Sequence, residues 1–256
     1  MNWLAKFLLA LAFLHPPFSR QIPLGGITAG SGGSGCTAGG SSPTIVQGGT
    51  GGGISHAGSA STVNTATSTG SVTGGDQLFV FAYCSTGART LSVSDSFSAG
   101  GSNAWVTLES NLSASPAAGE WSLFGVASSG NCVGGCNDTI TVTVTGGTCA
   151  DLNAGAMEAT NTSTTVDQGP GSASGLNSNN VTTLFANELA LGLLAGGNGG
   201  TNPTQGTGWT LLGHTNAGGT NPGFEGKALS SCSTLNAIWT GGTGTLQSNI
   251  ITIKHN

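Results

Sequence analysis

The stretch Asp138-Thr-Ile-Thr-Val-Thr-Val-Thr145 alternates apolar and polar side chains along its length. On an extended chain Ile140, Val142 and Val144 fall on one face, while the threonines fall on the other. Strict alternation of β-branched residues is typical of an antiparallel strand with one face buried and one exposed. We therefore predict a half-buried strand over residues 138–145.

Two further stretches indicate strands that are buried more deeply. Gln77-Leu-Phe-Val-Phe-Ala-Tyr-Cys84 is apolar on both faces, which fits a central strand covered on both sides. The leucines between Glu188 and Ala195 would also suit a helix, but Gly192 and the Gly196-Gly197 pair favour a buried strand. We expect additional strands at 89–94, 103–109, 119–127, 152–160, 207–214, 222–229, 235–240 and 246–254.

These short strands are separated by Gly, Asn and Ser and are accompanied by no convincing helix, a pattern that predicts an all-β protein. We expect an antiparallel β-sandwich, jelly-roll-like, over residues 54–256. Residues 21–53 are rich in Gly and Ser, so we expect a largely irregular N-terminal linker or arm that orders only where it packs against something.

The N-terminus has the pattern of an export signal. Lys6 precedes an apolar run from Phe7 to Leu14, and His15 followed by two prolines ends that run. The run is too short to span a bilayer, which takes about 20 apolar residues, but it suits the hydrophobic region of a signal peptide. No Ala-x-Ala cleavage motif follows, so a short helix or an anchoring strand on a virion protein is the alternative. We predict a signal peptide or apolar leader over residues 1–20 and no membrane span.

Charged residues make up 6% of the 256 residues, against roughly 25% in ordinary soluble domains. Lys and Arg number 5, which excludes a coiled coil and leaves too few cations to neutralise the phosphates of a nucleic acid. The net charge of −5 implies no particular partner. Solubility therefore has to come from Thr, Ser and Asn on outward faces.

The chain has six cysteines: Cys36, Cys84, Cys132, Cys136, Cys149 and Cys232. Together with glycosylation sequons and scarce charge, they indicate an oxidising compartment and at least one disulfide. Cys132 and Cys136 could close a small local loop, whereas Cys84, Cys149 and Cys232 stand at or near strand ends, and the pairing stays open. Buried free thiols are the alternative. A zinc site lacks the four ligands that it needs, and we expect no metal and no cofactor.

Candidate catalytic groups are few. Gly30-Ser-Gly-Gly-Ser-Gly35 matches a dinucleotide-binding pattern, but no strand precedes it and no helix follows. A Ser-His-Asp triad would have to use His56 or His214, and each fits a surface or strand-end position better. A buried Glu such as Glu158, in an apolar strand, is more often an internal hydrogen-bond anchor than a catalyst. A glycosidase would need two facing carboxylates from among Asp95, Glu109, Glu120, Asp151, Glu158, Glu188 and Glu225. We expect no enzyme.

Aromatic residues and sequons supply the remaining candidate sites. We expect Trp121 and Trp239 in the core, whereas Trp105 and Trp209, near loop-rich ends, are weak candidates for a sugar-binding platform, with core packing as the alternative. The sequons predict exposed turns that could carry glycans, at Asn111, Asn137, Asn161 and Asn180.

The order of several segments is similar to a known group of proteins. They are Gly75-Asp-Gln-Leu-Phe-Val-Phe-Ala82, Val93-Ser-Asp-Ser96, Asn103-Ala-Trp105, Ala186-Asn-Glu-Leu-Ala-Leu-Gly192, Gly208-Trp209, Ala237-Ile-Trp239 and Ile250-Ile-Thr-Ile253. The chain resembles poorly characterised Gly/Ser/Thr-rich β-sandwich modules of exported bacterial surface proteins and of phage tail and fibre proteins. The resemblance covers most of residues 27–254, carries no catalytic residues, and offers no counterpart for the cysteines.

Taken together, the residues and the resemblance lead us to expect a non-catalytic structural or adhesive protein that is secreted, on a cell surface or on a virion. Charged residues on edge strands prevent pairing with other chains, and this chain has few of them. We therefore expect that an extended segment such as Ser59–Ser71 could add to a neighbouring subunit's sheet in a fibre. The expected partners are copies of itself, other surface or virion proteins, or glycans, and not nucleic acid. The alternatives are a lectin-like carbohydrate-binding module and a glycoside hydrolase or lyase on the same fold.

Overall fold

The strands of this protein form antiparallel ladders throughout. The computed structural model describes residues 35–48, 53–67, 71–87, 89–98, 101–111, 119–127 and 136–256. Within these ranges the one helical element is the 3-10 turn Ala217–Gly219, and every named strand pairing is antiparallel. The predicted all-β, antiparallel fold is therefore confirmed.

A central sheet runs through the middle of the body. Its strands lie in the order β1-β10-β5-β8-β7, and β2 also pairs with β10. The strands are β1 (Thr44–Gln47), β2 (Ser55–Ala60), β5 (Gln77–Cys84), β7 (Val106–Asn111), β8 (Glu120–Ala127) and β10 (Cys149–Thr160).

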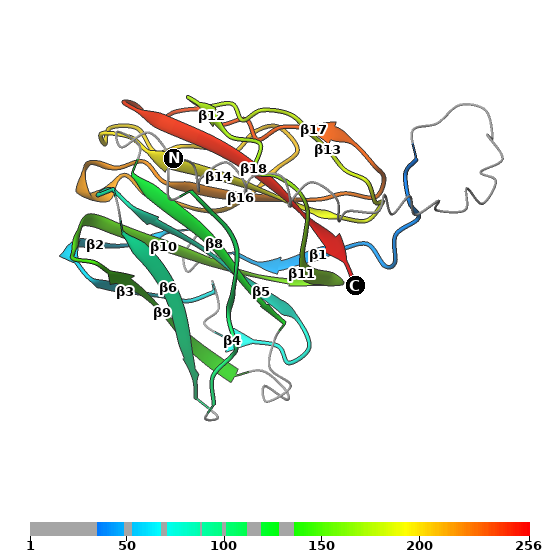
Figure 1. Cartoon of the computed structure of the whole chain (residues 1–256), viewed down its shortest axis with the longest axis horizontal. Coiled ribbons are helices and arrows are strands. Elements are labelled where there is room, and N and C mark those ends of the chain that lie inside the picture. Colours follow the sequence, from blue (N-terminus) through cyan, green and yellow to red (C-terminus); the bar gives the residue numbers. More distant parts are fainter. Residues whose placement is uncertain are drawn as a thin grey trace, which may run out of the picture. The chain divides into compact units, whose positions relative to one another are not determined.

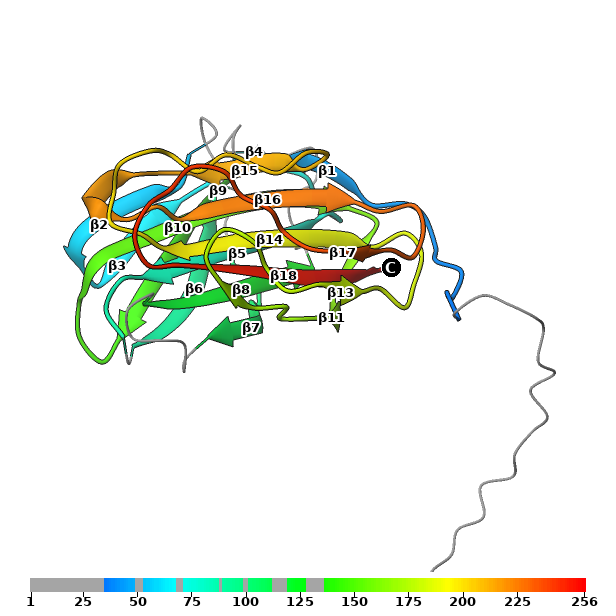
Figure 2. The same cartoon turned by 90° about the horizontal axis from the view of Figure 1, so that it is seen from above.

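A second sheet is built from the C-terminal part of the chain, in the order β11-β18-β14-β16-β15, with β12 on β18 (Figure 2). Its strands are β11 (Thr162–Gln168), β12 (Ala173–Ser174), β14 (Leu189–Gly196), β15 (Thr210–His214), β16 (Gly223–Ala228) and β18 (Leu246–His255). A separate two-stranded pair joins β13 (Val181–Thr182) to β17 (Thr234–Leu235).

A third sheet has β9 at its centre, with β3 and β4 on one side and β6 on the other. Its strands are β3 (Thr62–Thr65), β4 (Ser71–Val72), β6 (Thr90–Phe97) and β9 (Cys136–Thr145). The predicted alternation over 138–145 is confirmed, because Ile140, Val142 and Val144 are buried.

The three sheets pack face to face, with the central sheet between the other two (Figure 1). In β5, Phe79, Phe81 and Tyr83 pack against the second sheet. Val80 and Ala82 point the other way and pack against Ile140 and Val142 of the third sheet. All eight residues of β5 are buried, as predicted for a strand covered on both sides.

The expected buried strand at 188–195 is present as β14, in which every residue is buried. Gly192 is needed there, because a Cβ at this position would meet the side chains of Glu225 and Ala237 at 2.6 and 3.0 Å. The flanking β16 and β18 pair with β14 without a register shift. A small residue at 192 thus lets the second sheet bury a carboxyl group on its outward face.

The expected strand at 235–240 is wrong in its extent. Only Thr234–Leu235 forms a strand, and Ile238 and Thr240 make isolated bridges. Ala237 and Trp239 are buried, while Thr240 is exposed, because the segment crosses the outer face of the second sheet instead of joining its ladder. An extended segment that lies across a sheet face buries every second side chain, so its sequence shows the same alternation of apolar and polar residues as a paired strand.

The segment expected to add to a neighbouring subunit pairs within its own chain where it is described. Ala60 lies opposite Cys149 in β10, Thr62–Thr65 pairs with β9, and Ser71 lies opposite Asn137. Within the described residues these strands pair with β10 and β9 alone, and addition of the segment to a neighbouring subunit's sheet stays a prediction.

Two disulfides join described residues, and they confirm the prediction of disulfide bonding. Cys84 and Cys149 link the end of β5 to the start of β10. Cys36 and Cys232 fasten the Gly-rich N-terminal region to the loop after β16. The backbone of Thr37 also exchanges hydrogen bonds with Leu184 and Ala186, each of 2.9 Å.

Several predictions concern residues outside the described ranges. Cys132 lies there, so the small Cys132–Cys136 loop stays a prediction, as does the leader over residues 1–20. Among the described residues, no helix is long and apolar enough to cross a membrane.

Proteolytic digestion of the unreduced protein should release peptides linked through Cys84–Cys149 and through Cys36–Cys232. The double variant Cys84→Ala/Cys149→Ala should unfold in urea with a free energy lower by about 4 kcal/mol, because a long chain segment is freed in the unfolded state. A different linkage in the peptide map, or an unchanged unfolding free energy in the double variant, would contradict this assignment.

Candidate functional site

One polar cluster lies where the central sheet meets the turn between β15 and β16. His56 Nε2 is 3.1 Å from Asp151 Oδ1, within hydrogen-bond distance, and the contact is an ion pair when the imidazole is protonated. The register of β2 and β10 explains the contact, since Asp151 lies opposite Gly58 and Asn153 opposite His56, which places His56 and Asp151 diagonally on one face.

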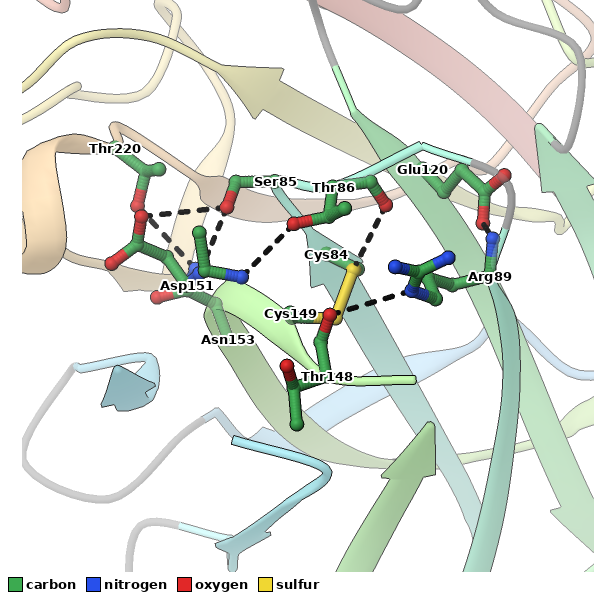
Figure 3. Close-up of a disulfide and its surroundings, with 11 residues drawn as sticks. Cys84, Ser85, Thr86, Arg89, Glu120, Thr148, Cys149, Asp151, Asn153 and Thr220 are labelled. Carbon is green, nitrogen blue, oxygen red and sulfur yellow. Dashed lines mark hydrogen bonds between the residues drawn. A yellow bond between two sulfur atoms is a disulfide. The ribbon is translucent and has the colours of Figure 1, made fainter. Parts of the chain in front are cut away.

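The second oxygen of Asp151 is used by the loop after β5. Ser85 Oγ donates to Asp151 Oδ2 at 3.4 Å, and the Asp151 N–H donates to Ser85 Oγ at 2.8 Å. Figure 3 shows Ser85, Thr86 and Asp151 beside the Cys84–Cys149 disulfide. A Cβ on Gly218, whose φ is +65°, would overlap Asp151 Oδ1 and His56 Nε2, so the 3-10 turn closes over the ion pair.

This arrangement holds elements together and lacks the geometry of a catalytic triad. In a triad the serine hydroxyl bonds the imidazole nitrogen that faces away from the aspartate. Here Ser85 and His56 both bond the same carboxylate. His56 and Asp151 are 95 residues apart in the sequence, so no local pattern predicts that they meet.

Glu158, which is buried, and Asp76, which is half-buried, form a carboxyl pair. Glu158, fully buried in β10, accepts hydrogen bonds from Gln47 Nε2 and from the Thr73 N–H, the latter at 2.6 Å. Burial, the hydrogen bond to Glu158 and the charge of Glu158 together raise the pKa of Asp76 to about 6. The neighbouring carboxyl group thus disfavours the ionised form of Asp76.

Glu188 and Asp167 form a second pair beside the second sheet. Burial raises the pKa of Glu188 to about 7, and the hydrogen bond to Asp167 adds to the effect. The Phe185 N–H donates to Glu188 Oε1 at 3.2 Å, and the Leu184 N–H donates to Asp167 Oδ2 at 2.8 Å. Each carboxyl group therefore anchors the backbone of the chain that leads into β14.

Glu225, on β16, is fully buried and has no carboxyl partner of this kind. Burial raises its pKa to about 8, although the N–H of Gly206, 3.1 Å from Oε2, and the charge of Lys227 act in the opposite direction. Glu120 at the start of β8 is also buried and accepts a 2.6 Å hydrogen bond from the Arg89 N–H. Both side chains thus bond to the backbone of a neighbouring loop.

The carboxylates considered for glycoside hydrolysis are arranged differently from a catalytic pair. Such a pair is about 5–10 Å apart with the sugar between the two groups. The pairs formed by Glu158 and by Glu188 are hydrogen-bonded directly, and both glutamates are fully buried. Among the described residues, no group of three or more His, Cys, Asp or Glu side chains is gathered in a way that could hold a metal ion.

Trp105 and Trp209 lie on opposite sides of the central sheet. Trp105 is half-buried against the clusters of the third sheet, whereas Trp209 is 8% exposed and packs on the outer face of the second sheet. The Lys227 ammonium lies 5.9 Å from the centre of the Trp209 ring. The two rings therefore form no common platform. Trp121 and Trp239 lie in the core, as predicted.

The sequon asparagines occupy different local structures. Asn161 is exposed at the turn between β10 and β11, with φ +56°, and its Nδ2 donates to the Ser42 carbonyl at 3.0 Å. Asn180 is exposed just before β13. Asn137 is exposed too, but it lies within β9, and Asn111 ends β7, so neither is in the predicted turn.

No family model, no curated protein and no solved structure matches this chain.

The raised carboxyl pKa values predict that this protein is most stable in acid. Burial raises the pKa of Glu225 to about 8 and that of Glu188 to about 7 in the folded chain, whereas in the unfolded chain both ionise near the ordinary glutamate pKa of 4.5. The folded state therefore binds more protons between these limits, and the unfolding free energy falls as the pH rises from about 4.5 to 8. Thermal melts across this range measure the effect.

Glu225→Gln should flatten that pH dependence, because the amide stays neutral in both states. The double variant Glu188→Gln/Glu225→Gln should flatten it further. A melting temperature of the unaltered protein that is constant or rises between pH 4.5 and 8 would contradict this interpretation.

Proposed function

We propose that this chain is a non-catalytic structural module whose copies associate through an exposed strand edge, in a secreted, cell-surface or virion assembly. The two disulfides indicate an oxidising compartment, which fits such a location. The fold proposed for it is a jelly-roll-like sandwich with an added third layer.

The observation that carries this proposal is the edge formed by β6. Among the described strands, β6 pairs only with β9, and the eight-residue ladder between them has no register shift. The Val144 N–H donates to Ser61 on the β3 side of β9. Because N–H groups alternate along a strand, Ser92 and Ser94 bond β9, and the N–H groups of Leu91, Val93 and Asp95 point to the free edge.

The outward face of β6 carries few of the features that protect strand edges. In natural proteins, Lys or Pro residues and β-bulges on edge strands prevent these strands from pairing with other chains. The exposed side chains of β6 are Thr90, Ser92, Ser94 and Ser96, and none of them is charged or large. Among the described side chains of this face, a neighbouring strand would therefore meet neither a charge nor a large residue.

The third sheet also presents a continuous uncharged surface. The outward residues of β9 are Thr139, Thr141, Thr143 and Thr145, and Ser92 and Ser94 lie opposite Thr143 and Thr141. On the other side Thr62 and Asn64 continue the same rows, and Thr141 Oγ1 donates to Asn64 Oδ1 at 2.9 Å. A hydroxyl-covered face without charge supports contacts that change little with salt.

The carbohydrate-binding and hydrolase alternatives have less support. Trp105 and Trp209 are separated by the central sheet, and the buried carboxyl pairs leave no room for a sugar between their members.

Val93→Pro should convert the assembled protein to monomers, because it removes an N–H that faces the free edge and spares the bonds to β9. Ser94→Lys, which adds a charge on the exposed face, should act in the same direction. Light scattering and negative-stain microscopy measure the assembly, and circular dichroism checks the fold.

Val106→Pro is the matched control. Val106 is the exposed first residue of β7, where proline is tolerated, so this variant should assemble like the unaltered protein. An unaltered protein that is monomeric at every concentration, or assembly that persists in both β6 variants, would overturn the proposal.

A further inference from the structure

Two aspartates face the interior from neighbouring strands of the third sheet. Asp95 lies opposite Ile140 in the β6–β9 ladder, and Asp138 lies opposite Phe97. They are therefore diagonal neighbours on the same, inward face. Asp95 is 9% exposed and Asp138 is 4% exposed. Two carboxyl groups thus meet inside the end of the third sheet.

Asp138 differs from the other buried carboxyl groups of the chain. Both of its oxygens are inaccessible and neither has a hydrogen-bond partner. Glu158 and Glu188, by contrast, accept hydrogen bonds from backbone N–H groups and are hydrogen-bonded to a second carboxyl group. A buried carboxyl group without such partners costs folding free energy, which calls for a partner that is not part of the protein.

Asp95 is held in place beside Asp138 by the loop that leads into β7. The Asn103 N–H donates to Asp95 Oδ1 at 2.7 Å, and Asn103 Nδ2 lies 2.5 Å from Asp95 Oδ2. An asparagine amide presents an oxygen in place of its nitrogen after a half-turn of the side chain. Two carboxylates and one amide are thus gathered from β6, β9 and this loop.

No described basic side chain forms an ion pair with either aspartate. Burial, together with the nearby charge of Asp95, raises the pKa of Asp138 to about 7. A negative charge on this pair has no described basic side chain to compensate it.

We propose that Asp95, Asp138 and the Asn103 side-chain oxygen bind a calcium ion. Calcium takes six to eight oxygen ligands from carboxylates, amides, peptide carbonyls and water in flexible geometry. Zinc and copper prefer nitrogen or sulfur ligands, and magnesium demands near-ideal octahedral geometry and keeps its waters. Two carboxylates neutralise the double charge of the ion. The bound ion would connect β6 to β9 and to the 101–105 loop.

Calorimetric titration of calcium chloride into the EDTA-treated full chain at neutral pH tests the site. We expect saturable binding of one ion per chain, with a Kd of roughly 0.1–1 mM as in extracellular calcium modules. The melting temperature should rise with calcium and respond less to magnesium. An unaltered protein that shows neither binding heat nor a raised melting temperature at roughly tenfold above that range would overturn the proposal.

Asp138→Asn and Asp95→Asn should each weaken calcium binding by roughly tenfold or more, because each removes a charged ligand. Both variants should fold, since asparagine has nearly the same shape and removes a buried charge. Glu188→Gln, which alters a buried carboxyl group of the second sheet, is the matched control and should bind calcium normally. Equal calcium binding by the control and both aspartate variants would contradict the assigned ligands.

Discussion

The burial of β5 and β10 on both faces is the constraint on which the rest of this structure depends. Phe79 and Phe81 need a cover on one side of the central sheet, and Val80 and Ala82 need another cover on the opposite side. A two-layer arrangement would leave one of these faces in water, at a cost of about 25 cal/mol for each Å² of apolar surface. The second and third sheets supply the two covers.

Burial also affects the acidic side chains of the core, which need partners inside the protein. With 5 Lys and Arg against 10 Asp and Glu, buried carboxyl groups have few cationic partners. Glu158 and Glu188 are instead paired with a second carboxyl group and with backbone N–H groups. These hydrogen bonds take the place of the contacts that basic side chains usually provide. Asp138 is the exception, because neither of its oxygens has a hydrogen-bond partner. A bound cation would supply the missing partner.

The third sheet brings the proposed functions of this molecule together. Its outer face carries hydroxyl groups, its β6 edge is open among the described strands, and its inner face holds Asp95 and Asp138. Since Asp95 belongs to β6, an ion bound there would stiffen the same strand that is proposed to pair with a neighbour. Calcium and assembly would then be coupled through one element, with no contact between the ion and the partner chain.

Local periodicity was enough to identify the half-buried strand at 138–145, the two-faced strand at 77–84 and the core positions of Trp121 and Trp239, because alternation along the chain reports burial directly. The same alternation places Asp138 on the face of Ile140, a signal that could have marked it as buried. The third layer, the Cys36–Cys232 bond, the His56–Asp151 contact and the course of residues 235–240 required the folded chain. Each depends on residues far apart in sequence, whose meeting is set by sheet packing, and no local pattern encodes it.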